Sequence, residues 1–311
     1  MKYVNKKGVD LSVFSMGTVQ LGMDYGLGDF TAKPKKEYAF ELLDRATSQG
    51  VNNLDTANNY GESEKVIGEW LRTKAPEARP MVVTKIGPLD HSSPEALRAD
   101  FMAQTEKCLE TLGVEQIDIL MLHYFEDYEQ HPALVMELFA ELKAAGKIRY
   151  SGISVYSRHD YKFIAKSGID SIQIPLNLFD WAQIENGGIQ ALADAGMMIF
   201  ARSVFLQGLV FFKPEQVDPR MDFCLPYLEK FIALCEEFKM SPSVLAVSFV
   251  LSVPGITTVV LGCQTLEQID SNCEMIGQVR QLTPEEMAKI REAFVEIDPR
   301  VINPGCWFNH T

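Results

Sequence analysis

Apolar and polar positions along the chain repeat one arrangement, in which an amphipathic helical stretch is followed by a glycine and a short apolar run. In one copy Leu97, Phe101 and Leu112 fall at helical spacing, Gly113 follows, and residues 117–122 are almost continuously apolar. Glycine suits the position after a helix, where a left-handed backbone disfavours any Cβ. The same order recurs around Gly50, Gly146, Gly168 and Gly196. The pattern therefore predicts a regular alternation of helices and strands.

The predicted strands are eight short apolar runs, at residues 14–19, 51–57, 81–86, 117–124, 148–155, 172–178, 198–203 and 258–262. Their nearly continuous apolar character is typical of strands that are covered on both faces. Strict alternation of strand and helix requires parallel pairing through right-handed crossovers. Eight such units in 311 residues predict the α/β class and a single (β/α)8 TIM barrel domain over residues 1–311.

A doubly wound open sheet is the alternative architecture, and it predicts a G-x-G-x-x-G turn after the first strand. Here that turn reads Gly17-Thr-Val-Gln-Leu-Gly22, which favours the barrel. Three predicted helix starts match the capping box, at residues 92–95, 265–268 and 283–286. The irregular segment 212–221 and the C-terminal tail after Ile297 are expected to form loops over the barrel mouth.

The balance of charged residues argues against some classes of binding partner. The chain carries 29 Lys and Arg against 42 Asp and Glu, a net charge of −13, which disfavours nucleic acid and anionic membranes. Its 6 cysteines form no C-x-x-C pair, which argues against a metal site and a disulfide framework. With neither a signal peptide nor an apolar run long enough to span a bilayer, we expect a cytoplasmic protein that acts on a small molecule. The sequence leaves its oligomeric state open.

Polar side chains end three consecutive predicted strands. Asp55, Lys85 and His123 lie near the carboxyl ends of the second, third and fourth strands, and Tyr60 lies in the loop after Asp55. Since barrels carry their chemistry at the carboxyl ends of the strands, we expect these four side chains to converge. Lys85 would make the Tyr60 phenol a better proton donor, Asp55 would hold Lys85 charged, and His123 would orient a substrate oxygen.

Each of these residues has a structural alternative. A buried Asp–Lys pair, a histidine in a barrel and a tyrosine in a loop all serve packing more often than chemistry. The combination of four at one end of the barrel favours catalysis. A third interpretation, in which Lys85 forms a Schiff base, is disfavoured because Asp55 should keep that amine protonated.

These residues stand in longer motifs that resemble the aldo-keto reductase superfamily. The motif at 51–61, Val-Asn-Asn-Leu-Asp-Thr-Ala-Asn-Asn-Tyr-Gly, continues to Gly68, and Val-Thr-Lys at 83–85 and Asp-Ile-Leu-Met-Leu-His at 118–123 follow. The resemblance implies an oxidoreductase that reduces an aldehyde or ketone, a sugar-like carbonyl among them, by hydride transfer from NAD(P)H. It implies that Tyr60 is the general acid. The alternative is a non-catalytic barrel that binds nicotinamide as a regulatory or redox-sensing subunit.

The resemblance also implies a set of cofactor-binding residues, namely Gly17, Thr18, Asp55, Ser154, Gln173, Arg202, Ser203, Leu206, Gly208, Gly262, Gln264, Gln268 and Asn272. Two positions depart from the family pattern. Val155 stands where the family commonly has an asparagine that holds the nicotinamide amide, and Arg202 stands where an aromatic residue often stacks on the ring. The adenosine loop at 262–272 lacks Lys and Arg and carries Glu267 and Asp270. The family's habit favours NADPH, with NADH as the open alternative.

Aromatic residues near the predicted mouth are the candidates for substrate binding, principally Tyr25, Tyr124, Phe125, Trp181 and Trp307, with Phe179, Phe205 and Phe308 as further candidates.

Overall fold

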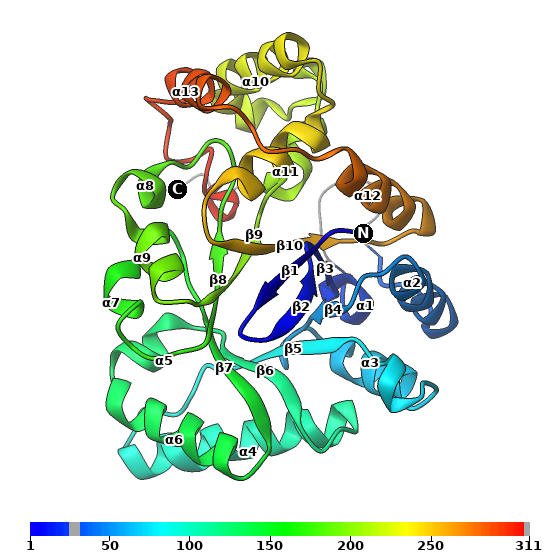
Figure 1. The fold of residues 1–311 in the computed structure, drawn as a ribbon, viewed down its shortest axis with the longest axis vertical. Coiled ribbons are helices and arrows are strands. Elements are labelled where there is room, and N and C mark those ends of the chain that lie inside the picture. Colours follow the sequence, from blue (N-terminus) through cyan, green and yellow to red (C-terminus); the bar gives the residue numbers. More distant parts are fainter. Residues whose placement is uncertain (25–31, 308–311) are drawn as a thin grey trace.

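The computed structural model describes residues 1–24 and 32–307. Its centre is a closed barrel of parallel strands in the order β10-β3-β4-β5-β6-β7-β8-β9 (Figure 1). The barrel strands are β3 (Phe14–Gly17), β4 (Asn53–Asp55), β5 (Met81–Ile86), β6 (Ile117–Leu122), β7 (Ile148–Ser154), β8 (Ser171–Pro175), β9 (Met198–Arg202) and β10 (Ile256–Gly262). The predicted TIM barrel is confirmed, and each predicted strand overlaps one of these.

Helices follow the strands and surround the barrel (Figure 1). The longer ones are α2 (Lys36–Ser48), α3 (Ser63–Leu71), α4 (Pro94–Leu112), α6 (Pro132–Ala144), α9 (Gly188–Asp194), α11 (Pro242–Ser252) and α12 (Leu266–Gln278). Short helices fill the loops, at α1 (Val19–Gly22), α5 (Phe125–Glu129), α7 (Tyr161–Ile164) and α8 (Ala182–Glu185). Two more, α10 (Leu225–Phe238) and α13 (Pro284–Ala293), pack together beyond α11. Five single-turn or irregular 3-10 segments are η1 (Pro76–Ala78), η2 (Leu206–Phe211), η3 (Pro214–Gln216), η4 (Pro219–Cys224) and η5 (Pro304–Cys306).

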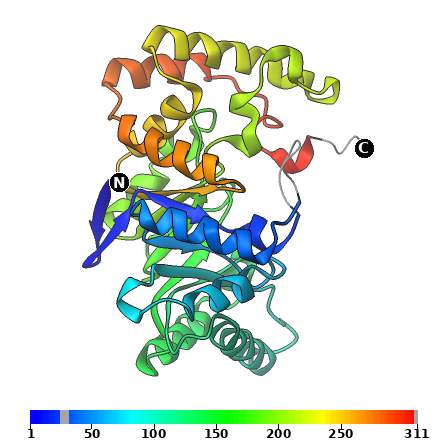
Figure 2. The same ribbon diagram turned by 90° about the vertical axis from the view of Figure 1, so that its right-hand side faces the viewer.

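An N-terminal hairpin, which the sequence analysis missed, covers the end of the barrel where the strands begin. It pairs β1 (Tyr3–Lys6) with β2 (Val9–Ser12) in antiparallel fashion and leads directly into β3. Figure 2 shows the hairpin at one end of the barrel and η5 at the opposite end. Leu11 of the hairpin is fully buried against a barrel-interior cluster, made of Val83, Ile119, Met121, Met198 and Phe200. The hairpin therefore closes this end of the barrel.

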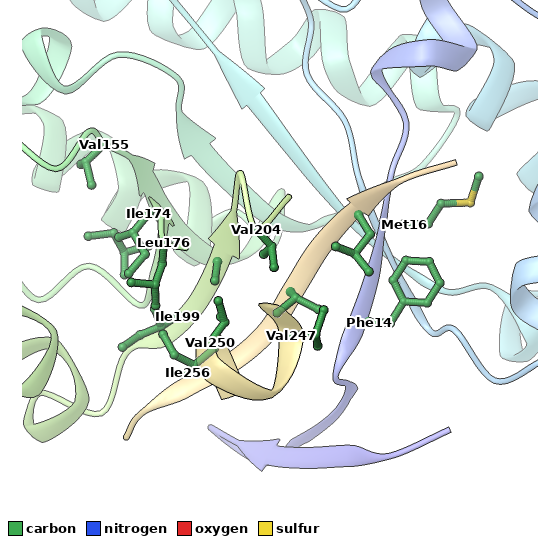
Figure 3. Packing of buried hydrophobic residues seen from close by; sticks show 14 of the residues in the cluster. Phe14, Met16, Val155, Ile174, Leu176, Ile199, Val204, Val247, Val250 and Ile256 are labelled. Carbon is green, nitrogen blue, oxygen red and sulfur yellow. The ribbon is translucent and has the colours of Figure 1, made fainter. Parts of the chain in front are cut away.

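A second apolar layer joins the sheet to the surrounding helices. In Figure 3, Val247 and Val250 of α11 pack near Ile199 of β9 and Ile256 of β10. Helix α11 is apolar on nearly all sides because strands and neighbouring helices cover it together, and burial of such side chains contributes about 1.5–3 kcal/mol each. This layer fixes the carboxyl ends of the strands that carry the polar side chains.

The helix starts agree with the predicted caps only in part. The capping box at 283–286 is complete, since Thr283 accepts from the Glu286 amide and the Glu286 carboxylate accepts from the Thr283 amide. At 265–268 the threonine side chain caps the helix without the reciprocal bond. The third prediction is wrong by one residue. Ser93, not Ser92, caps α4, because this places a proline at the first helical position, where its missing N–H is not needed.

Candidate active site

Four polar side chains meet at the carboxyl end of the barrel. Asp55 ends β4, Lys85 lies one residue before the end of β5, and His123 directly follows β6. The Lys85 ammonium donates to Asp55 Oδ1 at 2.8 Å and to the carbonyl oxygen of Thr56 at 2.8 Å. The Lys85 nitrogen lies 5.1 Å from the centre of the Tyr60 ring. The His123 ring meets the Tyr60 ring edge-on at 5.6 Å.

Lys85 is held in its charged form. Its side chain is fully buried, and burial alone would lower its pKa. The negative charge of Asp55, together with Tyr60 and the hydrogen bond to Asp55, outweighs burial, so the pKa of Lys85 lies above its ordinary value. A buried ammonium beside a phenol favours the phenolate, which makes the phenol a better proton donor.

His123 is held in its neutral form. Burial, followed by the positive charges of Lys85 and Arg202, lowers the pKa of His123 from 6.5 to about 3. A neutral imidazole keeps one N–H donor. Its buried Nδ1 atom has no hydrogen-bond partner among residues 1–24 and 32–307. His123 therefore brings a hydrogen-bond donor to the site without a charge of its own.

A cavity of about 780 Å³ runs from these side chains to the start of α12. Asp55, Tyr60 and His123 line one end of it, and Gln268 and Asn272 line the other. The predicted cofactor-binding residues lie in its wall except Leu206, namely Gly17, Thr18, Asp55, Ser154, Gln173, Arg202, Ser203, Gly208, Gly262, Gln264, Gln268 and Asn272. Leu206 is fully buried in the apolar core instead. In the part of the chain that the structure describes, no cluster of His, Cys, Asp or Glu could hold a metal ion.

Gln173 and Arg202 have defined partners in the cavity wall. Gln173, on β8, donates from its side-chain amide to Asp55 Oδ1 at 2.7 Å, so it belongs to the same network as Lys85. Arg202, at the end of β9, donates to the backbone carbonyl of Val155 at 3.1 Å. Val155 thus holds Arg202 through its backbone carbonyl group, while the Val155 side chain is fully buried.

A model of the aldo/keto reductase family matches residues 14–294, which is most of the chain. The chain belongs to the aldo/keto reductase family. Its relatives include "Uncharacterized oxidoreductase YqkF" of Bacillus subtilis (strain 168), 28% identical and covering 89% of this chain and 94% of the relative. Another is "NADH-specific methylglyoxal reductase" of Escherichia coli (strain K12), 25% identical over 85% of this chain and 89% of that protein.

Solved structures agree on the fold of this family member. The aldo-keto reductase AKR11C1 from Bacillus halodurans, solved in its holo form, aligns with a TM-score of 0.76 at 21% sequence identity. The match covers 97% of this chain and 100% of that one. At this identity the likeness supports the barrel architecture alone.

The aromatic candidates for substrate binding differ in where they lie in this aldo/keto reductase. Tyr124 and Phe205 line the cavity. Tyr25 and Phe308 lie outside the described residues. The remaining candidates do not line the cavity but pack in the protein interior or between helices, which does not support their predicted role: Phe125, Phe179, Trp181 and Trp307.

Each misplaced aromatic has a clear packing partner. Phe125 stacks on His159 with ring centres 4.3 Å apart. Trp181 packs against Phe249, with ring centres 5.1 Å apart. Trp307 is fully buried, and its indole N–H donates to the backbone carbonyl of Arg300, in the same C-terminal tail, at 2.9 Å. The described part of the tail therefore packs on the barrel without lining the cavity.

Several cavity-lining residues escaped the sequence analysis, among them Gln20, Tyr156, Gln207, Phe211, Ser243 and Ser271. Tyr156 carried a usable signal, since it is an aromatic residue two positions after the end of β7. Ser243 carried none, because it lies in the first turn of α11 and reaches the cavity only through the packing of that helix.

Proposed function

We propose that the protein reduces an aldehyde or ketone to an alcohol with a nicotinamide cofactor. The observation that supports this most strongly is the placement of a buried ammonium and a neutral imidazole next to the Tyr60 ring, 5.1 Å and 5.6 Å from its centre. Carbonyl reduction builds negative charge on the oxygen and needs a proton there. Tyr60, supported by Lys85, supplies that proton at the cavity end.

Proton transfer follows from the charges of the site. The Tyr60 hydroxyl donates its proton to the carbonyl oxygen, and the resulting phenolate is stabilised by the ammonium of Lys85. An ordinary phenol has a pKa of about 10, so without this ammonium Tyr60 would be a weak acid near neutral pH. Asp55 keeps Lys85 charged and oriented through the 2.8 Å hydrogen bond. Solvent returns the proton to Tyr60 after each turnover.

His123 has a separate task. Because it stays neutral, it donates a hydrogen bond to the carbonyl oxygen while Tyr60 transfers the proton. Such a donor orients the substrate and stabilises the charge that develops on its oxygen. A bound nicotinamide supplies the hydride that completes the reaction at the carbonyl carbon.

The cavity suits a dinucleotide. It extends from Tyr60 to Asn272, and its wall contains a side-chain oxygen of Gln20 that has no hydrogen-bond partner among the described residues. The end of the Gln20 side chain lies against Gly262 in this wall. Ser154 and Gln173 would hold the nicotinamide amide. Gln268 and Asn272 would hold the adenine.

We infer that NADH is the preferred form, which revises the expectation of NADPH. A 2′-phosphate is usually paired with Lys or Arg. Among the described residues that line the cavity, Arg202 is the sole basic side chain, and it lies on β9 rather than near α12. Glu267 lines the adenosine end and would repel a phosphate. The Escherichia coli relative named as NADH-specific is consistent with this choice.

The variant Tyr60→Phe tests this function. We expect NADH-dependent reduction of a panel of aldehydes to fall by at least about 10²-fold, because the proton donor is lost. The affinity for NADH should stay near that of the wild type. Turnover is measured by loss of NADH absorbance, and affinity by calorimetry.

Tyr161→Phe is the matched control. Tyr161 is a buried tyrosine on α7, outside the cavity lining, and loses the same hydroxyl in this variant. It should reduce the panel at the wild-type rate. Undiminished turnover by Tyr60→Phe would refute the assigned proton donor. A wild-type protein that binds NADH but reduces no carbonyl would favour the regulatory alternative.

A further inference from the structure

Arg202 is a cation without a neutralising partner in the wall of the cavity. Its guanidinium donates to the carbonyl of Val155 at 3.1 Å and to the hydroxyl of Ser203 at 3.3 Å, and it lies 4.8 Å from the centre of the Tyr156 ring. All three partners are uncharged. Among residues 1–24 and 32–307, no carboxylate forms an ion pair with Arg202. These contacts fix the guanidinium while leaving its charge uncompensated.

The other charges near Arg202 compensate each other. Asp55 and Lys85 form a buried ion pair at 2.8 Å. His123 is neutral, and the charge of Arg202 is among the causes of its low pKa, after burial and Lys85. Glu267, the remaining acidic residue in the described lining, lies in the first turn of α12 and not on the strands that carry Arg202 and its neighbours. Among the described residues that line this end of the cavity, Arg202 therefore carries the positive charge that has no acidic partner.

Arg202 lies close to the residues assigned to the nicotinamide. Ser154, Gln173 and Arg202 belong to the neighbouring strands β7, β8 and β9, and Ser154 pairs with Gln173 in the sheet. An oxidised nicotinamide ring carries a positive charge, whereas the reduced ring is neutral. A fixed cation in a half-buried wall therefore acts differently on the two forms.

We propose that Arg202 makes this site bind the reduced cofactor more tightly than the oxidised one, so that the protein takes up NADH in preference to NAD⁺ and releases the spent cofactor readily. This inference rests on the proposed function. An uncharged side chain at the same position would lack this effect. Arg202 thus acts as a selector of cofactor redox state.

The test compares dissociation constants of NADH and NAD⁺, measured by calorimetry on the wild type and on Arg202→Gln. We expect the wild type to bind NADH at least about tenfold more tightly than NAD⁺. In Arg202→Gln the ratio should fall towards one, chiefly because NAD⁺ binds better relative to NADH. Arg202→Lys, which retains the charge, should keep the preference.

Arg158→Gln is the matched control. Arg158 stacks on the same ring, 4.9 Å from the centre of Tyr156, but it is exposed, pairs with Glu126 and does not line the cavity. Its loss should leave the ratio unchanged. Equal weakening of both ligands in Arg202→Gln, or a wild type that shows no preference, would overturn the proposal. A wild type that binds neither ligand would refute the proposed function itself, and the inference with it.

Discussion

Charge states at the catalytic end of the cavity are set by burial and by immediate neighbours. Lys85 and His123 are both largely buried, yet they respond in opposite ways. Asp55 accepts a hydrogen bond from Lys85 and keeps it charged, whereas His123 faces only positive charges and becomes neutral. Burial alone would have made both neutral. The position of one carboxylate therefore determines which of the two side chains is charged and which is neutral, and the proposed roles of Lys85 and His123 follow from that difference.

The low pKa of His123 predicts a specific dependence on pH. In the folded protein it titrates at about 3, whereas an unfolded histidine titrates at about 6.5. At a pH between these two pKa values, His123 is protonated in the unfolded chain and neutral in the folded protein. The free energy of unfolding should therefore fall as the pH drops from about 6.5 towards 3. Nitrogen chemical shifts of the His123 ring should show a neutral imidazole at pH 5.

The variant His123→Gln is the control for this effect. It should lose the part of the pH dependence that belongs to the imidazole, while the contributions of the carboxylates remain. An imidazolium signal from His123 at pH 5 would contradict the assigned charge states.

The sequence predicts the position of a side chain well where the fold fixes it. Side chains at the carboxyl ends of barrel strands meet at one end of the barrel, so the proximity of Asp55, Lys85 and His123 could be predicted before the structure. The aromatic residues could not. Whether Trp307 enters the cavity or the core depends on how the tail folds back, and no local pattern encodes that.

Among the helices and strands, the regular ones could be predicted from the sequence and the irregular ones could not. Helix, glycine and strand recur with enough regularity that the barrel strands could be predicted, and Gly113 does adopt the left-handed backbone, with φ of 67°. The N-terminal hairpin was missed because its strands, Tyr3–Lys6 and Val9–Ser12, are short and only half-buried. Its turn at Lys7 and Gly8 lacks the usual Asn-Gly signal, although both residues have positive φ.

The hairpin's contribution to stability can be measured through Leu11. Because this side chain is fully buried against the barrel interior, Leu11→Ala should lower the free energy of unfolding by about 2–5 kcal/mol. Leu11→Met nearly conserves volume and should cost less than about 1.5 kcal/mol. Denaturant unfolding followed by circular dichroism gives both values. If Leu11→Ala lowered the free energy of unfolding by less than about 1 kcal/mol, the packing of the hairpin against the barrel interior would not contribute to stability as the structure implies.

At the scale of the whole molecule, a strongly acidic protein contains a cavity whose catalytic end is positive. The chain carries a net charge of −13, while Lys85 and Arg202 lie at the carboxyl ends of the strands. No helix among the described residues is long and apolar enough to cross a membrane. The closed barrel brings residues from 17 to 272 to a single cavity, and the proposed reaction centre and cofactor site both lie in it.

The most direct test of this account is a calorimetric titration of the purified protein with NADH and, separately, with NADPH. The account predicts saturable binding of NADH and binding of NADPH that is weaker by about tenfold or more. Glu267→Gln should narrow that difference, whereas Asp270→Asn should not, because Asp270 bonds Gln49 outside the cavity. Tighter binding of NADPH would contradict the assigned cofactor preference. Binding of neither would contradict the central claim that this cavity is a nicotinamide site.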